Sequence, residues 1–171
     1  MAVGDKVDAG GKVEVAIAIL YQGGKFLMQL RDDLPHILFP GHWGFFGGHL
    51  DPGENADAGV RRELREEIGY VPEILTLFER SEDERVIRNF YQAELIVPVA
   101  QLELNEGQDL GLCSVEDIQR GYKYSAKVGE DRPLGLPHQT VLLRFLERSA
   151  PINTPVSGPV KKADRAKHNR P

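Results

Sequence analysis

The amino-acid sequence predicts a single α+β domain built from β-strands and amphipathic helices. Apolar, β-branched runs at 12–21 and 86–97 are typical of strands in the interior of a sheet. Residues 55–69 instead carry apolar side chains at helical spacing, which predicts an amphipathic helix. The length of 171 residues, of which 41% are hydrophobic and 27% charged, suits one domain with its own core.

The first predicted elements form a β-hairpin. The apolar run at 12–21 is followed by the turn signal Gln22-Gly23-Gly24, and residues 25–30 return as the second strand. A loop at 31–42, with two prolines and two histidines, precedes a short strand at 43–48. We expect this loop to form one rim of a functional site, because the chain then enters a glycine-rich turn.

The helix that follows the glycine-rich turn has recognisable ends. Asn55 is a good N-cap, since its side-chain oxygen can accept a hydrogen bond from a first-turn amide. Gly69 suits the left-handed residue that closes a helix. Apolar residues recur between these ends at i, i+4 and i+8, which predicts one buried stripe. The stripe consists of Val60, Leu64 and Ile68.

Three carboxylates gather on another face of this helix. Glu63, Glu66 and Glu67 stand at i, i+3 and i+4, where like charges repel by a few tenths of a kcal/mol per pair. A hard divalent cation would offset that repulsion, because Mg²⁺ prefers carboxylate oxygens and commonly bridges to phosphates. The alternative is a solvated acidic face balanced by the arginines of the same helix. Gly47 and Gly48 favour a ligand site, since glycine lets the backbone approach a ligand closely.

The second half of the chain begins with further predicted strands. We expect strands at 73–80 and 86–97, separated by a charged turn at 81–85. Residues 98–104 are expected to form a connector or a further short strand. A short helix is then predicted at 114–118.

The last predicted elements are a loop and a closing helix. Residues 119–135 are predicted to form a poorly structured loop, of the kind that often carries specificity. Helical spacing of apolar residues predicts the closing helix at 136–148. The domain is therefore expected to span 12–148, between a flexible lead-in at 1–11 and a disordered basic tail at 149–171.

The net charge of −5 is unevenly distributed. The stretch from Val160 to Pro171 carries +4, and subtracting this from −5 leaves −9 on the rest. An acidic body argues against a stable complex with nucleic acid, whose phosphates demand a positive surface. Apolar runs fall short of the ~20 residues that cross a bilayer, so we expect no membrane partner. A single cysteine, Cys113, fits a reducing compartment and predicts a cytoplasmic location.

The glycine-rich turn and the acidic helix together resemble the signature of the Nudix (MutT-like) hydrolases. That signature is G-x5-E-x7-R-E-U-x-E-E-x-G-U, in which U is a bulky apolar residue. Gly48, Glu54 and the run from Arg62 to Tyr70 match every fixed position. Tyr70 is aromatic where an aliphatic residue is usual, and this departure affects no catalytic position.

The resemblance implies the Nudix fold, which is a mixed central β-sheet sandwiched between helices (α/β/α). It implies that Glu63 and Glu67, with Glu66 third, hold a metal ion. The main-chain carbonyl of Gly47 is expected to join these ligands. Arg62 is expected to pair with Glu54, so that the loop is held and Glu63 is aimed at the metal.

Four further residues are candidates for the site. Arg31 resembles an arginine that many Nudix enzymes place near the substrate phosphates, and a surface ion pair with a neighbouring aspartate is the alternative. Phe45 is a candidate for stacking on a base, with packing in the core as the alternative. Gly48 is a candidate for close approach of the backbone to the substrate. Glu106, in a Glu-Gly-Gln triplet, resembles a glutamate that joins the metal site from across the cleft in some family members. A plain turn would explain the triplet equally well.

The function implied by the resemblance is hydrolysis of the pyrophosphate linkage of a nucleoside diphosphate linked to a group X. The implied cofactor is Mg²⁺, with Mn²⁺ as the other candidate. The implied partner is a small nucleotide, either a nucleoside triphosphate, including oxidised ones, or a nucleotide sugar or ADP-ribose. The enzyme is expected to be a monomer or homodimer. The general base is open among Glu63, Glu66 and Glu106.

Two other functions are compatible with the same fold. One is a non-catalytic nucleotide-binding sensor domain, although such relatives commonly lose a glutamate of the signature and this chain keeps them all. The other is an enzyme resembling isopentenyl-diphosphate isomerase, which would need its own catalytic cysteine. Cys113 lies outside any matching context.

Overall fold

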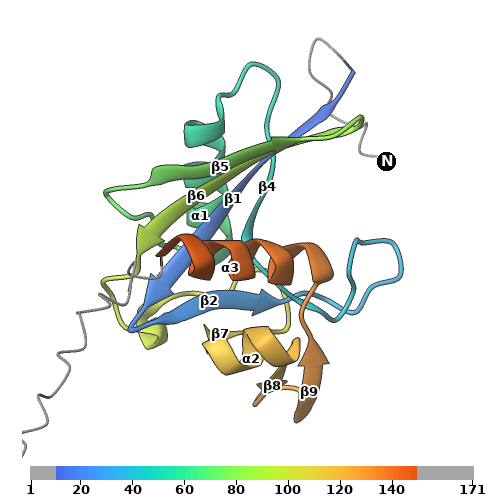
Figure 1. Cartoon of the computed structure of the whole chain (residues 1–171), viewed down its shortest axis with the longest axis vertical. Helices are drawn as coiled ribbons and strands as arrows, with labels where there is room; N and C mark the ends of the chain where they lie inside the picture. Colours follow the sequence, from blue (N-terminus) through green and yellow to red (C-terminus); the bar gives the residue numbers. More distant parts are fainter. Residues whose placement is uncertain (1–10, 150–171) are drawn as a thin grey trace, which may run out of the picture.

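The fold is organised around a mixed β-sheet, seen in a computed structural model that describes residues 11–149 (Figure 1). Its main path runs in the order β3-β2-β1-β6-β5, while β4 pairs with β1 and β7 with β2. β1 and β6 are parallel, and the other pairs are antiparallel. The strands are β1 (Val13–Gln22), β2 (Lys25–Leu30), β3 (Trp43–Gly44), β4 (Phe46–His49), β5 (Thr76–Glu82), β6 (Val86–Glu94) and β7 (Asp109–Cys113).

Helices cover both faces of the sheet, so the expected α/β/α arrangement is confirmed (Figure 1). Alternate residues of β1 enter two different cores, because successive side chains of a strand point to opposite faces. Ala16 and Leu20 pack with the apolar stripe of α1 (Ala56–Ile68). Ile19 packs instead with Phe145 of α3 (Leu136–Ser149). β1 is therefore buried on both sides, as its continuous apolar sequence predicted.

α1 forms as its sequence predicted, with a cap at each end. The Asn55 side chain accepts a hydrogen bond from the backbone N–H of Ala58, at 2.9 Å. Gly69 adopts the left-handed conformation with φ 64°, and its N–H donates to the carbonyl of Arg65. Val60, Leu64 and Ile68 are buried, as expected from their spacing. The acidic face of α1 is consequently held in a defined orientation against the sheet.

Three expected strands differ in their limits, and the one predicted at 86–97 ends at Glu94. The strand predicted at 43–48 is broken at Phe45 into β3 and β4, which pair with different partners. The strand predicted at 73–80 begins three residues later and includes part of the expected charged turn. The turn itself is closed by Asp83, whose carboxylate accepts hydrogen bonds from the N–H groups of Arg85 and Val86. Residues 98–104 contain a short 3₁₀ helix, Val99–Gln101.

The loop expected at 119–135 was wrongly predicted. After the short helix α2 (Val115–Arg120), this segment forms a hairpin of β8 (Tyr122–Ser125) and β9 (Glu130–Pro133). The strands are short and polar, so their sequence carries little strand signal. Tertiary contacts hold them instead: the Trp43 indole N–H donates to the carbonyl of Lys123, and Ser125 Oγ donates to Asp109 at 2.6 Å.

The ends of the predicted domain fall largely outside what the structure describes. The expected flexible lead-in and basic tail lie, apart from Gly11 and Ser149, beyond the described residues. Ser149 is the last residue of α3 rather than the first of a tail. Within 11–149, none of the helices combines the length and apolar character that a membrane span requires.

Candidate active site

The site begins at the glycine turn of β4. Gly47 has φ 130°, and a Cβ at this position would lie 2.2 Å from the carbonyl oxygen of Ala16 on β1. Only glycine tolerates both the left-handed backbone and this approach. The Gly47 N–H donates to Glu67 Oε2 at 2.8 Å. The turn is thereby tied both to the central strand and to the acidic face of α1.

Glu63 lies directly over the next glycine. A Cβ on Gly48 would lie 2.7 Å from Glu63 Oε1, so the absent side chain is what makes room for this carboxylate. Glu63 is half-buried. Burial raises its pKa above the ordinary value, although the nearby Arg62 opposes the shift. A carboxylate held in this way gains from a cation placed beside it.

Arg62 ties the loop to the helix. Its Nε and Nη2 donate to the two carboxylate oxygens of Glu54, each at 3.0 Å, in a bidentate pair. Its Nη1 donates to Glu63 Oε1 at 2.7 Å, and Nη2 also reaches the carbonyl of His49. The hydrogen bond to Arg62 lowers the pKa of Glu54, and the same pair raises the pKa of Arg62. Arg62 and Glu54 are therefore paired, while their role in aiming Glu63 at a metal stays a prediction.

Glu67 is the most deeply buried acid of the cluster, with 5% of its surface exposed. Its Oε2 accepts from the Gly47 N–H, and its Oε1 accepts from Gln29 Nε2 at 3.1 Å. Burial raises its pKa to about 8, because the effect of burial exceeds the lowering caused by these two hydrogen bonds. Glu63 also contributes to the increase through its negative charge.

Glu66 lies apart from the buried pair. Its side chain is exposed, and its contact with Arg62 Nη1 is 3.3 Å long. Its charge still raises the pKa of Glu63. Glu66 is therefore close to the cluster but free to move towards a ligand.

Glu106 is brought to the cluster by neighbours that are anchored on two elements. The Asn105 N–H donates to the carbonyl of Glu67 and its side-chain amide to the carbonyl of Glu66, so Asn105 caps the end of α1. On the other side, the Gln108 N–H donates to the carbonyl of Leu30 at 2.7 Å. The exposed carboxylate of Glu106 raises the pKa values of both Glu63 and Glu67.

The chemistry of these groups fits a hard cation. All the side-chain atoms in the cluster that could bind a metal are carboxylate oxygens, which suit Mg²⁺ better than Zn²⁺. Among residues 11–149, no group of three or more His, Cys, Asp or Glu side chains is arranged closely enough to hold a metal ion by itself. Glu63 and Glu67 are instead satisfied by N–H donors of the protein. Mg²⁺ usually binds through one or two carboxylates, waters and substrate phosphates, so a complete cage is not required.

The two remaining side-chain candidates are Phe45 and Arg31. Phe45 is 3% exposed and packs edge-on against Phe90 and His138, so its ring has no free face for a base. The expectation that it stacks on the substrate is therefore contradicted by its burial. Arg31 donates from its Nε to the carbonyl of Leu38, at 2.8 Å, and its expected role near the substrate phosphates stays a prediction.

Three polar residues contact the site or its neighbours without having been assigned a role from the sequence. Gln29 and Asn105 contact Glu67 and the end of α1, as described above. His138, in the first turn of α3, accepts from the Phe45 N–H at 3.4 Å, and burial lowers its pKa to about 4. One signal was available for Gln29, because it is a polar residue within the apolar run of β2.

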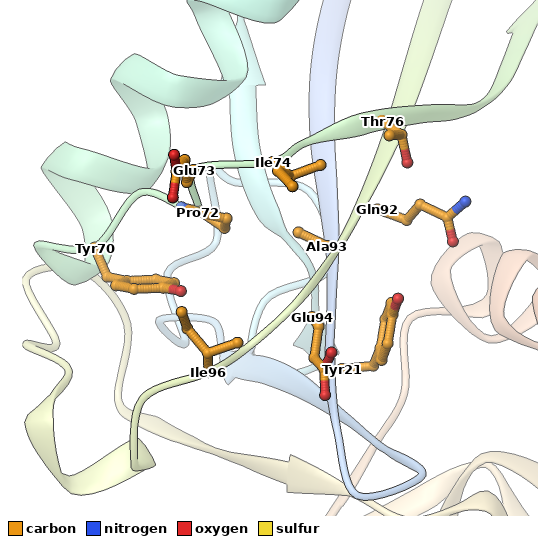
Figure 2. Close-up of a pocket in the computed structure, with 10 residues that line it drawn as sticks. All are labelled: Tyr21, Tyr70, Pro72, Glu73, Ile74, Thr76, Gln92, Ala93, Glu94 and Ile96. Atoms are coloured by element: carbon orange, nitrogen blue, oxygen red, sulfur yellow. The ribbon is translucent and has the colours of Figure 1, made fainter.

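A pocket of about 310 Å³ lies elsewhere, where β5 begins beside the end of α1 (Figure 2). Its lining includes Tyr21, Tyr70, Ile74, Glu94 and Ile96. None of the predicted site residues lines it. We therefore place no substrate chemistry in this pocket.

Comparison with known proteins adds a family and a fold. The NUDIX domain profile matches residues 11–132. A nucleoside triphosphatase NudI of Escherichia coli (strain K12 / DH10B) is 43% identical over 47 residues, which cover 28% of this chain and 32% of NudI. The chain thus spans about a third of the length of the curated relatives it matches.

Solved structures with the same fold are more distant in sequence. A MutT protein from Methanosarcina mazei Go1 superposes with a TM-score of 0.60 and 22% identity, covering 80% of this chain and 94% of that one. The NUDIX domain of Shewanella oneidensis NrtR, solved with ADP ribose, gives 0.58 and 21%, covering 80% and 88%. At these identities the comparison shows the fold alone, and it agrees with the fold expected from the sequence.

Proposed function

Because the chain belongs to the NUDIX domain family, we propose that it is a Mg²⁺-dependent hydrolase acting on a nucleoside diphosphate linked to a group X. The reaction is attack of water on one phosphorus of the pyrophosphate linkage. The observation that carries the proposal is the acid pair of α1 at the glycine turn. Glu67 is buried and Glu63 is half-buried, and they lie close enough for the charge of Glu63 to raise the pKa of Glu67.

The proposed metal ligands are Glu63 and Glu67, with Glu66, Glu106 and the main-chain carbonyl of Gly47 completing the set. When bound, Mg²⁺ supplies charge neutralisation at the diphosphate and makes water more acidic. Mn²⁺ is an alternative ion, because it has the same preference for oxygen ligands. The protein itself mainly positions groups, as phosphoryl chemistry requires.

The side chains around the metal ligands divide the remaining work. Arg62 donates hydrogen bonds to both Glu54 and Glu63, so it fixes the loop relative to the helix. The general base is one of Glu63, Glu66 and Glu106. Glu63 has a raised pKa, whereas Glu66 and Glu106 are exposed and can turn towards a water molecule. Arg31 donates to the Leu38 carbonyl through Nε, and its terminal Nη groups would donate to a phosphoryl oxygen.

We place nucleoside triphosphates, including oxidised ones, first among the substrates. The Glu-Gly-Gln triplet and the likeness to a nucleoside triphosphatase over 47 residues support this choice. Nucleotide sugars and ADP-ribose are the second class. The solved NrtR domain, which has the same fold, was crystallised with ADP ribose.

A sensor domain is the second candidate function, since the likeness to the ADP-ribose-bound domain would also fit binding without turnover. The isomerase alternative finds less support. Cys113 is fully buried, and burial raises the pKa of its thiol to about 12, which is unsuited to proton transfer near neutral pH. A cytoplasmic location and a monomeric or homodimeric state complete the proposal.

A phosphate-release screen tests the function. The full chain is incubated with nucleoside triphosphates, oxidised nucleotides, nucleotide sugars and ADP-ribose, with Mg²⁺, with Mn²⁺ or with a chelator. We expect release from one class that requires the metal and disappears with the chelator. Tight binding of a nucleotide without release across the panel would favour the sensor instead.

A further inference from the structure

Gln29 connects the buried acid of α1 to the glycine turn. It is 1% exposed and lies on β2. Its side-chain amide Nε2 donates to Glu67 Oε1 at 3.1 Å and to the carbonyl oxygen of Phe45 at 3.4 Å. Both amide hydrogens therefore have acceptors, one on the helix and one immediately before β4.

The other end of the same side chain meets the turn that carries Glu106. A Cβ on Gly107 would lie 3.0 Å from Gln29 Oε1 and 2.7 Å from the carbonyl oxygen of Leu30. The backbone of Gly107 therefore packs directly on Gln29. One amide group touches the three segments that supply Glu67, Gly47 and Glu106.

A glutamine at this position needs a reason, because the interior neighbours on β2 are apolar. Phe26, Leu27 and Met28 are all buried. A buried amide costs free energy unless it is hydrogen-bonded, and an apolar residue of similar size would pack here without that cost. What the amide supplies is a second N–H donor to Glu67, beside the Gly47 N–H.

We propose that Gln29 is a positioning residue for metal binding, acting through Glu67 and through the turn that carries Glu106. The two donors hold the Glu67 carboxylate in one orientation, and Gly107 is seated on the same amide. Loss of the amide would free Glu67 Oε1 to rotate and would loosen the Glu106 turn. This inference rests on the proposed function, since it concerns the ligands of the proposed metal.

The test compares Gln29→Leu with Gln22→Leu. Gln22 on β1 is a matched control, because its amide also donates twice, to the carbonyls of Leu95 and Val97, but lies away from the acids. Mn²⁺ affinity is measured on the substrate-free chain by electron paramagnetic resonance, and stability by urea unfolding. We expect Gln29→Leu to weaken Mn²⁺ binding by about tenfold or more, as is usual for outer-shell partners. Gln22→Leu should lower stability and leave the affinity unchanged.

Unchanged Mn²⁺ affinity in a folded Gln29→Leu protein would overturn the proposal and leave Gln29 a structural residue. Gln29→Met, a flexible side chain of similar length, serves if the leucine variant does not fold. In the unaltered chain, the Gln29 side-chain amide signals in an NMR spectrum should shift on addition of Mg²⁺, whereas those of Gln22 should not. The absence of that difference would also overturn the proposal.

A further variant separates failure of this inference from failure of the proposed function. If Glu67→Gln leaves Mn²⁺ affinity unchanged, the metal site itself is wrongly assigned. If Glu67→Gln weakens binding and Gln29→Leu does not, only the role of Gln29 is rejected.

Discussion

Individual carboxylates in this protein differ sharply in their surroundings, although the sequence places them within one turn of each other. Glu67 is buried and accepts two hydrogen bonds, Glu63 is half-buried beside Arg62, and Glu66 is exposed. Burial raises the pKa values of the first two. A cation would therefore gain most from Glu63 and Glu67.

Glu67→Gln should slow metal-dependent phosphate release by at least about 100-fold, because the buried anionic ligand is lost. The fold should persist, since the amide oxygen can still accept from the Gly47 N–H. Rates are measured with Mg²⁺ on the substrate found by screening, and folding by circular dichroism. Glu73→Gln, an exposed acid of the pocket in Figure 2, is the control and should retain the parental rate. Parental activity in the Glu67 variant would refute the site.

The two adjacent glycines should respond differently to alanine. At Gly48 the added Cβ meets the end of the Glu63 side chain, which can move, so stability should change little. The displaced carboxylate should slow hydrolysis by about 100-fold, as a misplacement of about 1 Å can do. At Gly47 the Cβ would clash with the Ala16 carbonyl, and the left-handed backbone would also be strained. The free energy of unfolding of Gly47→Ala should therefore fall by about 3 kcal/mol. Urea unfolding and initial rates check both; a strongly destabilised Gly48→Ala would contradict this account.

At the scale of elements, the turn at 105–108 joins α1 to β2. Asn105 caps the last carbonyls of the helix, and Gln108 bonds to the end of the strand. Glu106 lies between these two anchors, so its position depends on both elements. The short turn thereby couples the end of the acidic helix to the central sheet.

Gly107→Ala should weaken Mn²⁺ binding by about tenfold, because its Cβ would lie 2.7 Å from the Leu30 carbonyl and force the Glu106 turn away. Gly129→Ala is a matched control. Its φ of 84° is close to the 89° of Gly107, but nothing lies within 4 Å of its added Cβ. The free energy of unfolding of both variants should fall by about 1 kcal/mol, because alanine is strained in the left-handed backbone conformation. If Gly107→Ala and Gly129→Ala bind Mn²⁺ with equal affinity, Glu106 is not a ligand of the metal.

At the scale of the whole molecule, the buried acid links stability to pH. Glu67 has a pKa of about 8 in the folded chain, against an ordinary value of 4.5, so the folded state holds its proton more tightly. The stabilisation is complete below pH 4.5 and is lost as pH rises through about 8. Metal binding should oppose this loss, because it favours the charged carboxylate.

The free energy of unfolding of Glu67→Gln should therefore rise relative to the parent as pH increases from 5 to 9, by about 2 kcal/mol or more. The glutamine does not titrate, which isolates the contribution of Glu67. Urea unfolding at several pH values, in the presence of a chelator, measures the difference. Saturating Mg²⁺ should stabilise the parent more at pH 8 than at pH 5. A difference between the two proteins that does not change with pH would contradict the burial argument.

Much of the fold follows from local patterns in the sequence. The strand at 12–21, the caps of α1 and the closing helix are confirmed, because period and capping chemistry depend on residues a few positions apart. The hairpin of β8 and β9 escaped prediction, since its polar strands are held by Trp43 and Asp109 from distant parts of the chain. The break at Phe45 likewise comes from pairing with two different strands.

Local patterns in the chain are enough to show which acids share a helix face, where that helix begins and ends, and that a glycine turn lies beside it. Three features come from the folded arrangement instead: Glu67 is buried against Gln29, Glu106 is anchored between α1 and β2, and the Phe45 ring is enclosed. The difference lies in the range of the interactions. Helix periodicity and capping act within a few residues, whereas the order of strands in a sheet brings together residues whose separation along the chain leaves no local pattern.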